Sequence, residues 1–137
     1  MTKKEIEKIA KKIRKEAGSS DIYDIISDLD ITIKSCENKS HYIKLQGKKY
    51  IFLNRETPEE EKEFAIAHEL GHAILHDCEI NQNTPNIRRS QQIENEANYF
   101  AFVILGKKID KTYQYTTSQY ARQLGVSEET IIYVTSK

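Results

Sequence analysis

The sequence has few cysteines, no excess of charge of either sign and no long hydrophobic run. Its two cysteines, Cys36 and Cys78, lie far apart and in no metal-binding or redox spacing, which argues against a disulfide scaffold and suits the reducing cytoplasm. The 21 basic and 21 acidic side chains give a formal net charge of zero, whereas dedicated nucleic-acid-binding proteins normally carry a basic excess. No stretch approaches the ~20 consecutive apolar residues of a membrane helix.

The remaining composition is that of an ordinary folded protein. Of the 137 residues, 38% are hydrophobic and 31% are charged, which is enough to bury a core without disulfides. We predict one domain over residues 1–137, with an N-terminal helix (1–20), a core (21–106) and a C-terminal tail (107–137). Residues 2–17 have apolar side chains at helical spacing but lack the apolar run of at least ~7 residues that a secretory signal needs, so we expect an amphipathic helix.

Three short segments alternate apolar and polar residues, as half-buried strands do. They span residues 31–33, 42–45 and 50–53, with a turn predicted at 46–49. The expected fold class is α+β, with a small antiparallel sheet packed against a helical core and a pair of short helices near the C-terminus. A helix capped by Asp21 is expected to precede the sheet.

The longest predicted helix follows the sheet. Thr57 is the expected N-cap, Pro58 fits the first helical position, and Glu60 would complete a capping box. Residues 64–75 are apolar around nearly the whole helix, which predicts that it runs through the core. The polar residues 77–90 that follow are expected to form a loop.

This core helix contains His68-Glu69-Leu70-Gly71-His72, a His-Glu-x-x-His sequence. A spacing of four residues puts both imidazoles on one helix face, where they can bind a single tetrahedral zinc ion. We therefore predict His68 and His72 as zinc ligands, and Glu69 as the catalytic base that faces the water in the open coordination position. The weaker alternative is a pair of core histidines satisfied by hydrogen bonds.

A catalytic zinc needs a third protein ligand, and the other histidines are poor candidates. His76 lies eight residues beyond His68, or ~12 Å along a continuous helix, which is too far to share one ion. His76 is therefore expected in a supporting position or at the surface. His41 lies on the predicted sheet and is expected to be a surface residue.

The better source is a second apolar helix, expected from about Gln91 to a stop at Gly106, which carries Glu94 and Glu96. These two carboxylates differ by about 200° in direction, so only one can face the histidines. Glu94 shares a side with Asn98 and the apolar residues, whereas Glu96 is expected to face solvent. We favour Glu94 as the ligand, with Asn98 holding the ring N–H of a ligating histidine, and keep Glu96 as the alternative.

Three segments of the chain resemble the ImmA/IrrE family of zinc metallopeptidases. They are the strand and helix entry at 50–62, the histidine helix at 64–76, and Glu-x-Glu-Ala-Asn-x-Phe-Ala at 94–101. The resemblance covers roughly residues 21–105. It implies a gluzincin-like α+β core in which zinc is held by two histidines and by a glutamate of the following helix.

The resemblance also implies a role for each matching residue. The zinc ligands would be His68, His72 and Glu94, with Glu69 as the general base and Asn98 beside a ligand. Members are typically cytosolic proteins of bacteria or phages, and several cleave a helix-turn-helix repressor of a mobile element or stress regulon. We therefore expect a cytoplasmic, monomeric, zinc-dependent anti-repressor peptidase that acts on a repressor as a separate partner.

The tail favours a second interpretation, because residues 119–132 have the pattern of a helix-turn-helix with its turn at Gly125 and with Ser127 as the N-cap of the second helix. However, its second helix would begin with Glu128 and Glu129, whose carboxylates repel phosphates, so DNA binding is not expected. The alternative function is a regulatory or interaction protein, possibly DNA-associated, in which the zinc site is structural or inactive.

Overall fold

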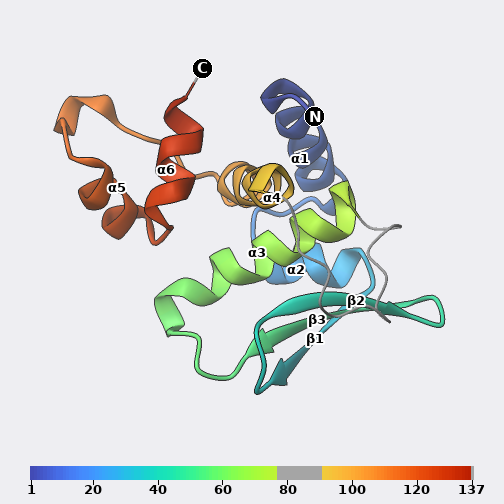
Figure 1. The fold of residues 1–137 in the computed structure, drawn as a ribbon. Coiled ribbons are helices and arrows are strands. Elements are labelled where there is room, and N and C mark those ends of the chain that lie inside the picture. The colour runs from blue at the N-terminus through green and yellow to red at the C-terminus, as the bar shows by residue number, and fades with distance from the viewer. Residues whose placement is uncertain (77–90, 137) are drawn as a thin grey trace.

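The computed structural model describes residues 1–76 and 91–136 (Figure 1). Its elements are α1 (Lys3–Ala17), α2 (Ile22–Asp28), β1 (Ile31–Cys36), β2 (His41–Leu45), β3 (Lys48–Asn54), α3 (Glu59–Leu75), α4 (Gln91–Ile104), the 3-10 helix η2 (Lys111–Tyr113), α5 (Thr117–Leu124) and α6 (Glu128–Thr135). The expected α+β class is confirmed. The predicted loop at 77–90, which includes Cys78, lies outside the described residues.

The N-terminal helices form where their caps and apolar spacing predict them. Thr2 and Glu5 make a reciprocal capping box at the start of α1, and Ile6 and Ala10 of this helix are fully buried. The side chain of Asp21 accepts a hydrogen bond from the backbone of Tyr23 at the start of α2. The predicted amphipathic helix at the N-terminus is thereby confirmed.

The sheet is mixed, so the expectation of a purely antiparallel sheet is wrong. Its strand order is β1-β3-β2, in which β2 and β3 pair antiparallel as a hairpin while β1 and β3 pair parallel. Gln46 and Gly47 have positive φ values of 50° and 81° and close the hairpin in two residues. Of the two hairpin strands, β3 is the one that pairs with β1, and its Ile51 is fully buried. Because β3 runs in the same direction as β1, this pairing is parallel.

The start of α3 also differs from the expectation. The helix begins at Glu59, its N-cap is Pro58, and no side chain caps it, so the predicted capping box of Thr57 and Glu60 is wrong. Glu59, Glu60 and Glu61 occupy the first turn, where negative charge is favourable at the positive end of the helix dipole. Charge therefore replaces a side-chain cap at this end.

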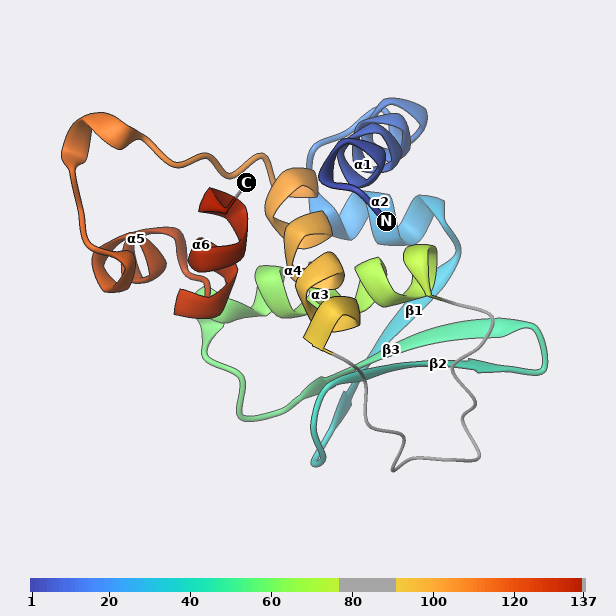
Figure 2. The ribbon, with the colours of Figure 1, turned by 45° about the horizontal axis from the view of Figure 1, so that its top comes forward.

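The helices lie in layers on one face of the sheet (Figures 1 and 2). Helices α2 and α3 contact the strands, and α4 packs on α3 on the side away from the sheet. Helix α1 and the C-terminal α6 pack against other sides of α4. Phe100, Ala101 and Ile104 of α4 are fully buried, so this helix is enclosed rather than lying on the surface.

The C-terminal helices have a small apolar cluster of their own. Tyr120, Ala121 and Ile131 are buried against Phe102 of α4. Gly125, at a φ of 69°, ends α5, and the side chain of Ser127 caps α6 as the sequence predicts. Within the residues described, no helix has the length and apolar character needed to cross a membrane.

Candidate metal centre

The site lies where α3 and α4 approach each other, and Gly71 permits that approach. A methyl group added at Gly71 would lie 3.1 Å from both the Cα and the carbonyl oxygen of Ala97, and 3.2 Å from a ring carbon of Phe100. Only glycine therefore leaves room for the backbone of α4 at this point. The parts of α3 just before and just after Gly71, which carry His68 and His72, therefore lie close to α4.

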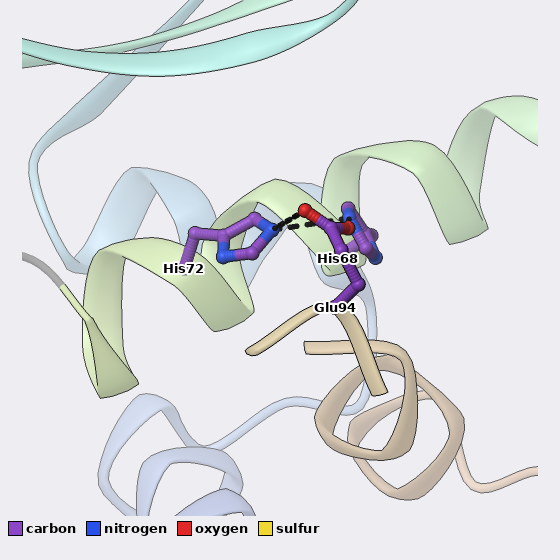
Figure 3. Close-up of side chains that lie close together, drawn as sticks. All are labelled: His68, His72 and Glu94. Carbon is purple, nitrogen blue, oxygen red and sulfur yellow. Dashed lines mark hydrogen bonds and ion pairs between the residues drawn. The ribbon is translucent and has the colours of Figure 1, made fainter. Parts of the chain in front are cut away.

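The structure brings His68 and His72 of α3 together with Glu94 of α4 (Figure 3). His68 Nε2 lies 2.9 Å from one Glu94 oxygen, and His72 Nε2 lies 3.3 Å from the other. The two Nε2 atoms are 3.2 Å apart. Two imidazole nitrogens and a carboxylate thus point at one small volume.

These separations fit a zinc ion. Atoms bound at ~2.0–2.1 Å in a tetrahedron around zinc lie ~3.3–3.4 Å from one another. The distances among the Nε2 atoms and the nearest Glu94 oxygens are 3.2, 2.9 and 3.3 Å, close to those edges. Two histidines and one carboxylate are also a donor set that zinc uses in catalytic sites, with one position left open.

Asn98 lies behind the first of the two histidines. Its Oδ1 is 2.6 Å from Nδ1 of His68, so the amide oxygen can accept a hydrogen bond from Nδ1–H while Nε2, the nitrogen that would bind a metal, faces Glu94. Burial lowers the pKa of His68, but its hydrogen bonds to Glu94 and Asn98 and the charges of Glu69 and Glu94 together raise that pKa above its ordinary value. Asn98 thus lies within hydrogen-bonding distance of a predicted zinc ligand.

The carboxylate of Glu94 is held in its charged form. Burial alone would raise its pKa, but hydrogen bonds from His68 and His72 and the charges of both rings lower it far below the usual range. A carboxylate that is ionised at neutral pH is ready to bind a cation without first losing a proton.

Burial differs sharply across the site. The side chain of His72 is fully buried, whereas those of His68 and Glu94 are 17% and 31% exposed. Glu69, the predicted base, is also buried, at 5% exposure. The site is therefore closed on the His72 side and open on the side of His68 and Glu94.

Glu96 does not face solvent, so that expectation is wrong. It is 6% exposed, because Met1, just before α1, and His76, at the end of α3, lie against its side chain. Its oxygens accept from Gln92 at 2.8 Å and from the Met1 ammonium at 3.1 Å, and one lies 2.9 Å from His76 Nε2. Burial raises the pKa of Glu96, but the bonds from His76, Gln92 and the ammonium lower it below its ordinary value.

Sequence reasoning missed this His76–Glu96 pair. His76 was expected in a supporting or surface position, and its Nδ1 lies 3.2 Å from Nδ1 of His72, on the opposite side of that ring from Glu94. The spacing of four residues between His72 and His76 indicates that these two rings share a helix face, but it carries no signal for the contact with Glu96. His41, by contrast, begins β2, stacks on Phe52 and takes no part in the site.

The geometry of this centre agrees with the comparison with known protein families. Among residues 1–76 and 91–136, no other group of histidine, cysteine and acidic side chains converges as His68, His72 and Glu94 do. No curated protein matches the chain at a significant level. The peptidase M78 family model, described as the IrrE N-terminal-like domain, matches residues 26–136 and so includes every residue of the site. The resemblance to ImmA/IrrE peptidases is thereby confirmed, and the chain belongs to this M78 family of IrrE N-terminal-like domains.

Proposed function

We propose that this chain is a zinc-dependent metallopeptidase that hydrolyses a peptide bond in a specific protein partner. The observation that carries the proposal is the convergence of His68, His72 and Glu94 from two helices, next to the buried Glu69. Membership of a peptidase family supports the same function. A structural zinc site would instead be closed by a fourth protein ligand, and the described cluster contains three.

Each side chain has a defined part in the proposed reaction. His68 and His72 would hold zinc through their Nε2 atoms, and Glu94 through its carboxylate. Zinc bound there would polarise the scissile carbonyl and lower the pKa of a water molecule toward ~7. Glu69 would accept the proton of the attacking water at a carboxylate oxygen and then deliver it to the leaving amine nitrogen.

The proposed substrate is a helix-turn-helix repressor of a mobile element or stress regulon, present as a separate chain. This part of the proposal is supported by the resemblance to ImmA/IrrE peptidases, several of which cleave such repressors. The exposure of His68 and Glu94 beside the fully buried His72 indicates the side from which a peptide would enter.

The Glu69→Gln variant tests the catalytic mechanism. It removes the base but keeps the shape of the side chain and all three proposed ligands, so we expect unchanged zinc content and a loss of cleavage of ~10²-fold or more. The measurement is cleavage of a purified helix-turn-helix repressor, followed by mass spectrometry. Undiminished cleavage by the variant would defeat the mechanism.

The same experiment separates the peptidase from the alternative function. A wild-type protein that binds zinc and its repressor but leaves the repressor intact would indicate a regulatory protein with an inactive centre. A wild-type protein that binds no zinc would remove the basis of both proposals.

A further inference from the structure

A line of three side chains continues from the candidate metal centre into the protein. His72 directs Nε2 toward Glu94, and its other ring nitrogen, Nδ1, lies 3.2 Å from Nδ1 of His76. The far nitrogen of His76, Nε2, lies 2.9 Å from an oxygen of Glu96. His72 and Glu96 are buried and His76 is half-buried, so water competes little for these contacts.

The positions of the protons in this line follow from the end nearest the metal. If Nε2 of His72 keeps its lone pair for a cation, the proton of that neutral ring is on Nδ1. Nδ1 of His72 then donates to Nδ1 of His76, which must accept and therefore carries its own proton on Nε2. That Nε2–H points at Glu96, and an ionised carboxylate can only accept. Every contact in the line is satisfied by one arrangement of protons.

Glu96 is itself held in place for this role. Gln92, one turn earlier on α4, donates its side-chain N–H to the second oxygen of Glu96 at 2.8 Å. The first oxygen is thereby left facing His76. His76 is the C-cap residue of α3, with φ −130° and ψ 15°, so its backbone leaves the helical path just where its ring reaches across to α4.

We propose that His76 and Glu96 are positioning residues for the metal centre, and that they fix the ring orientation and the tautomer of His72. Glu96 holds the proton of His76 on Nε2, and His76 accepts the proton of His72 Nδ1, so Nε2 of His72 stays available to the metal. His68 receives the same support directly from the neutral amide of Asn98, whereas His72 receives it through a second histidine from a carboxylate. The inference rests on the proposed zinc centre.

Zinc affinity and metal-free stability, measured together, test this proposal. The variants are His76→Phe, which keeps an aromatic ring without nitrogens, and Glu96→Gln, which keeps shape and removes charge. We expect ~10–100-fold weaker zinc binding for His76→Phe and a smaller loss for Glu96→Gln, measured by competition with a chromophoric chelator. The control is Gln91→Ala on the exposed start of α4, which should bind zinc as the wild type does.

The metal-free melting temperature distinguishes positioning from packing. A purely structural role would lower this temperature in both variants and leave zinc affinity unchanged, and that pattern would overturn the proposal. Equal zinc affinity in all three variants and the wild type would also overturn the positioning proposal, and it would leave the proposed peptidase function standing. Zinc binding by the wild type without cleavage would contradict only the proposed function, and no zinc binding at all would contradict both.

Histidine ring NMR of the zinc-loaded wild type provides a direct readout that requires no variant. Long-range ¹H–¹⁵N spectra should show protons on Nδ1 of His72 and on Nε2 of His76, with Nδ1 of His76 unprotonated. In Glu96→Gln, where the acceptor is neutral, the His76 signals should shift while those of His68 stay in place. A proton on Nδ1 of His76 in the wild type would overturn the proposal.

Discussion

Glu94 and Glu96 are two residues apart on one helix and have different partners. Glu94 lies between His68 and His72, and Glu96 contacts His76 and Gln92. The rotation of about 200° between them accounts for the difference in direction. Glu96 still reaches a histidine, because the backbone of His76 leaves the helical path at the end of α3 and its ring extends toward α4.

Removal of Glu94 should weaken the proposed centre more than any change at Glu96. Glu94→Ala deletes a ligand atom, so we expect zinc affinity to fall by more than ~100-fold, beyond the ~10–100-fold typical of changes in supporting residues. Competition with a chelator measures the affinity. Asn95→Ala, at a side chain that accepts from Gln91 near the surface, is the matched control on the same helix. If Glu96→Ala lost more affinity than Glu94→Ala, Glu96 would be the third ligand.

At the scale of elements, the crossing of α3 and α4 controls the site. His68 and His72 come from α3, and Glu94 and Asn98 come from α4, so a shift between these helices separates both pairs. Gly71 lies at the contact between the two backbones. Glycine is unfavourable within a helix by ~1 kcal/mol relative to alanine, and the close contact with α4 explains its presence here.

The Gly71→Ala variant should be less stable despite the better helix propensity of alanine. The added methyl would press on the backbone of Ala97, and such overpacking costs ~1–3 kcal/mol against a gain of ~1 kcal/mol in propensity. We expect the free energy of unfolding of the metal-free protein to fall by about 1 kcal/mol, measured in urea. Zinc affinity should fall as well, since α4 carries Glu94. A variant more stable than the wild type would show that α4 absorbs the methyl group without strain.

At the scale of the whole molecule, α4 connects the first and last segments of the chain to the site. Lys3 of α1 donates to the carbonyl oxygen of Tyr133 at 2.6 Å and lies 4.8 Å from the centre of its ring. The ring of Tyr133 packs edge-on against Tyr99 of α4. The first and last helices, α1 and α6, therefore both pack against the helix that carries Glu94, one on either side of it (Figure 2).

Because the proposed ion would join α3 to α4, metal removal should destabilise the molecule as a whole. We expect zinc to co-purify at about one equivalent per chain. At a free concentration of ~100 times its dissociation constant, zinc would stabilise the folded state by about 2.7 kcal/mol. A chelator should then lower the melting temperature by roughly 5–10 °C, as scanning calorimetry would measure. A protein without metal and without a response to the chelator would rule out the proposed centre.

The sequence by itself determined the elements and the chemistry of the histidine helix. Apolar spacing placed Ile6 and Ala10 inward, and the caps at Asp21 and Ser127 were predicted where they occur. Because His68 and His72 are four residues apart, their rings share one face whenever the segment is helical. Rotation about the second helix then favoured Glu94, which the structure places beside both rings. These features depend on near neighbours along the chain, whose relative directions a helix sets.

Only the tertiary structure decided the features that depend on what packs against an element. The parallel pairing of β1 with β3 depends on which of the two hairpin strands lies beside β1. The alternation of apolar and polar residues is the same in parallel and antiparallel strands, so it cannot predict this. Glu96 was predicted to face solvent, but its side chain is buried because Met1 and His76 lie against it. Its partner His76 could not be recognised from spacing, since the contact crosses from one helix to another. A pattern of residues shows which faces of a helix are apolar, but burial of a polar face depends on partners far away in the sequence.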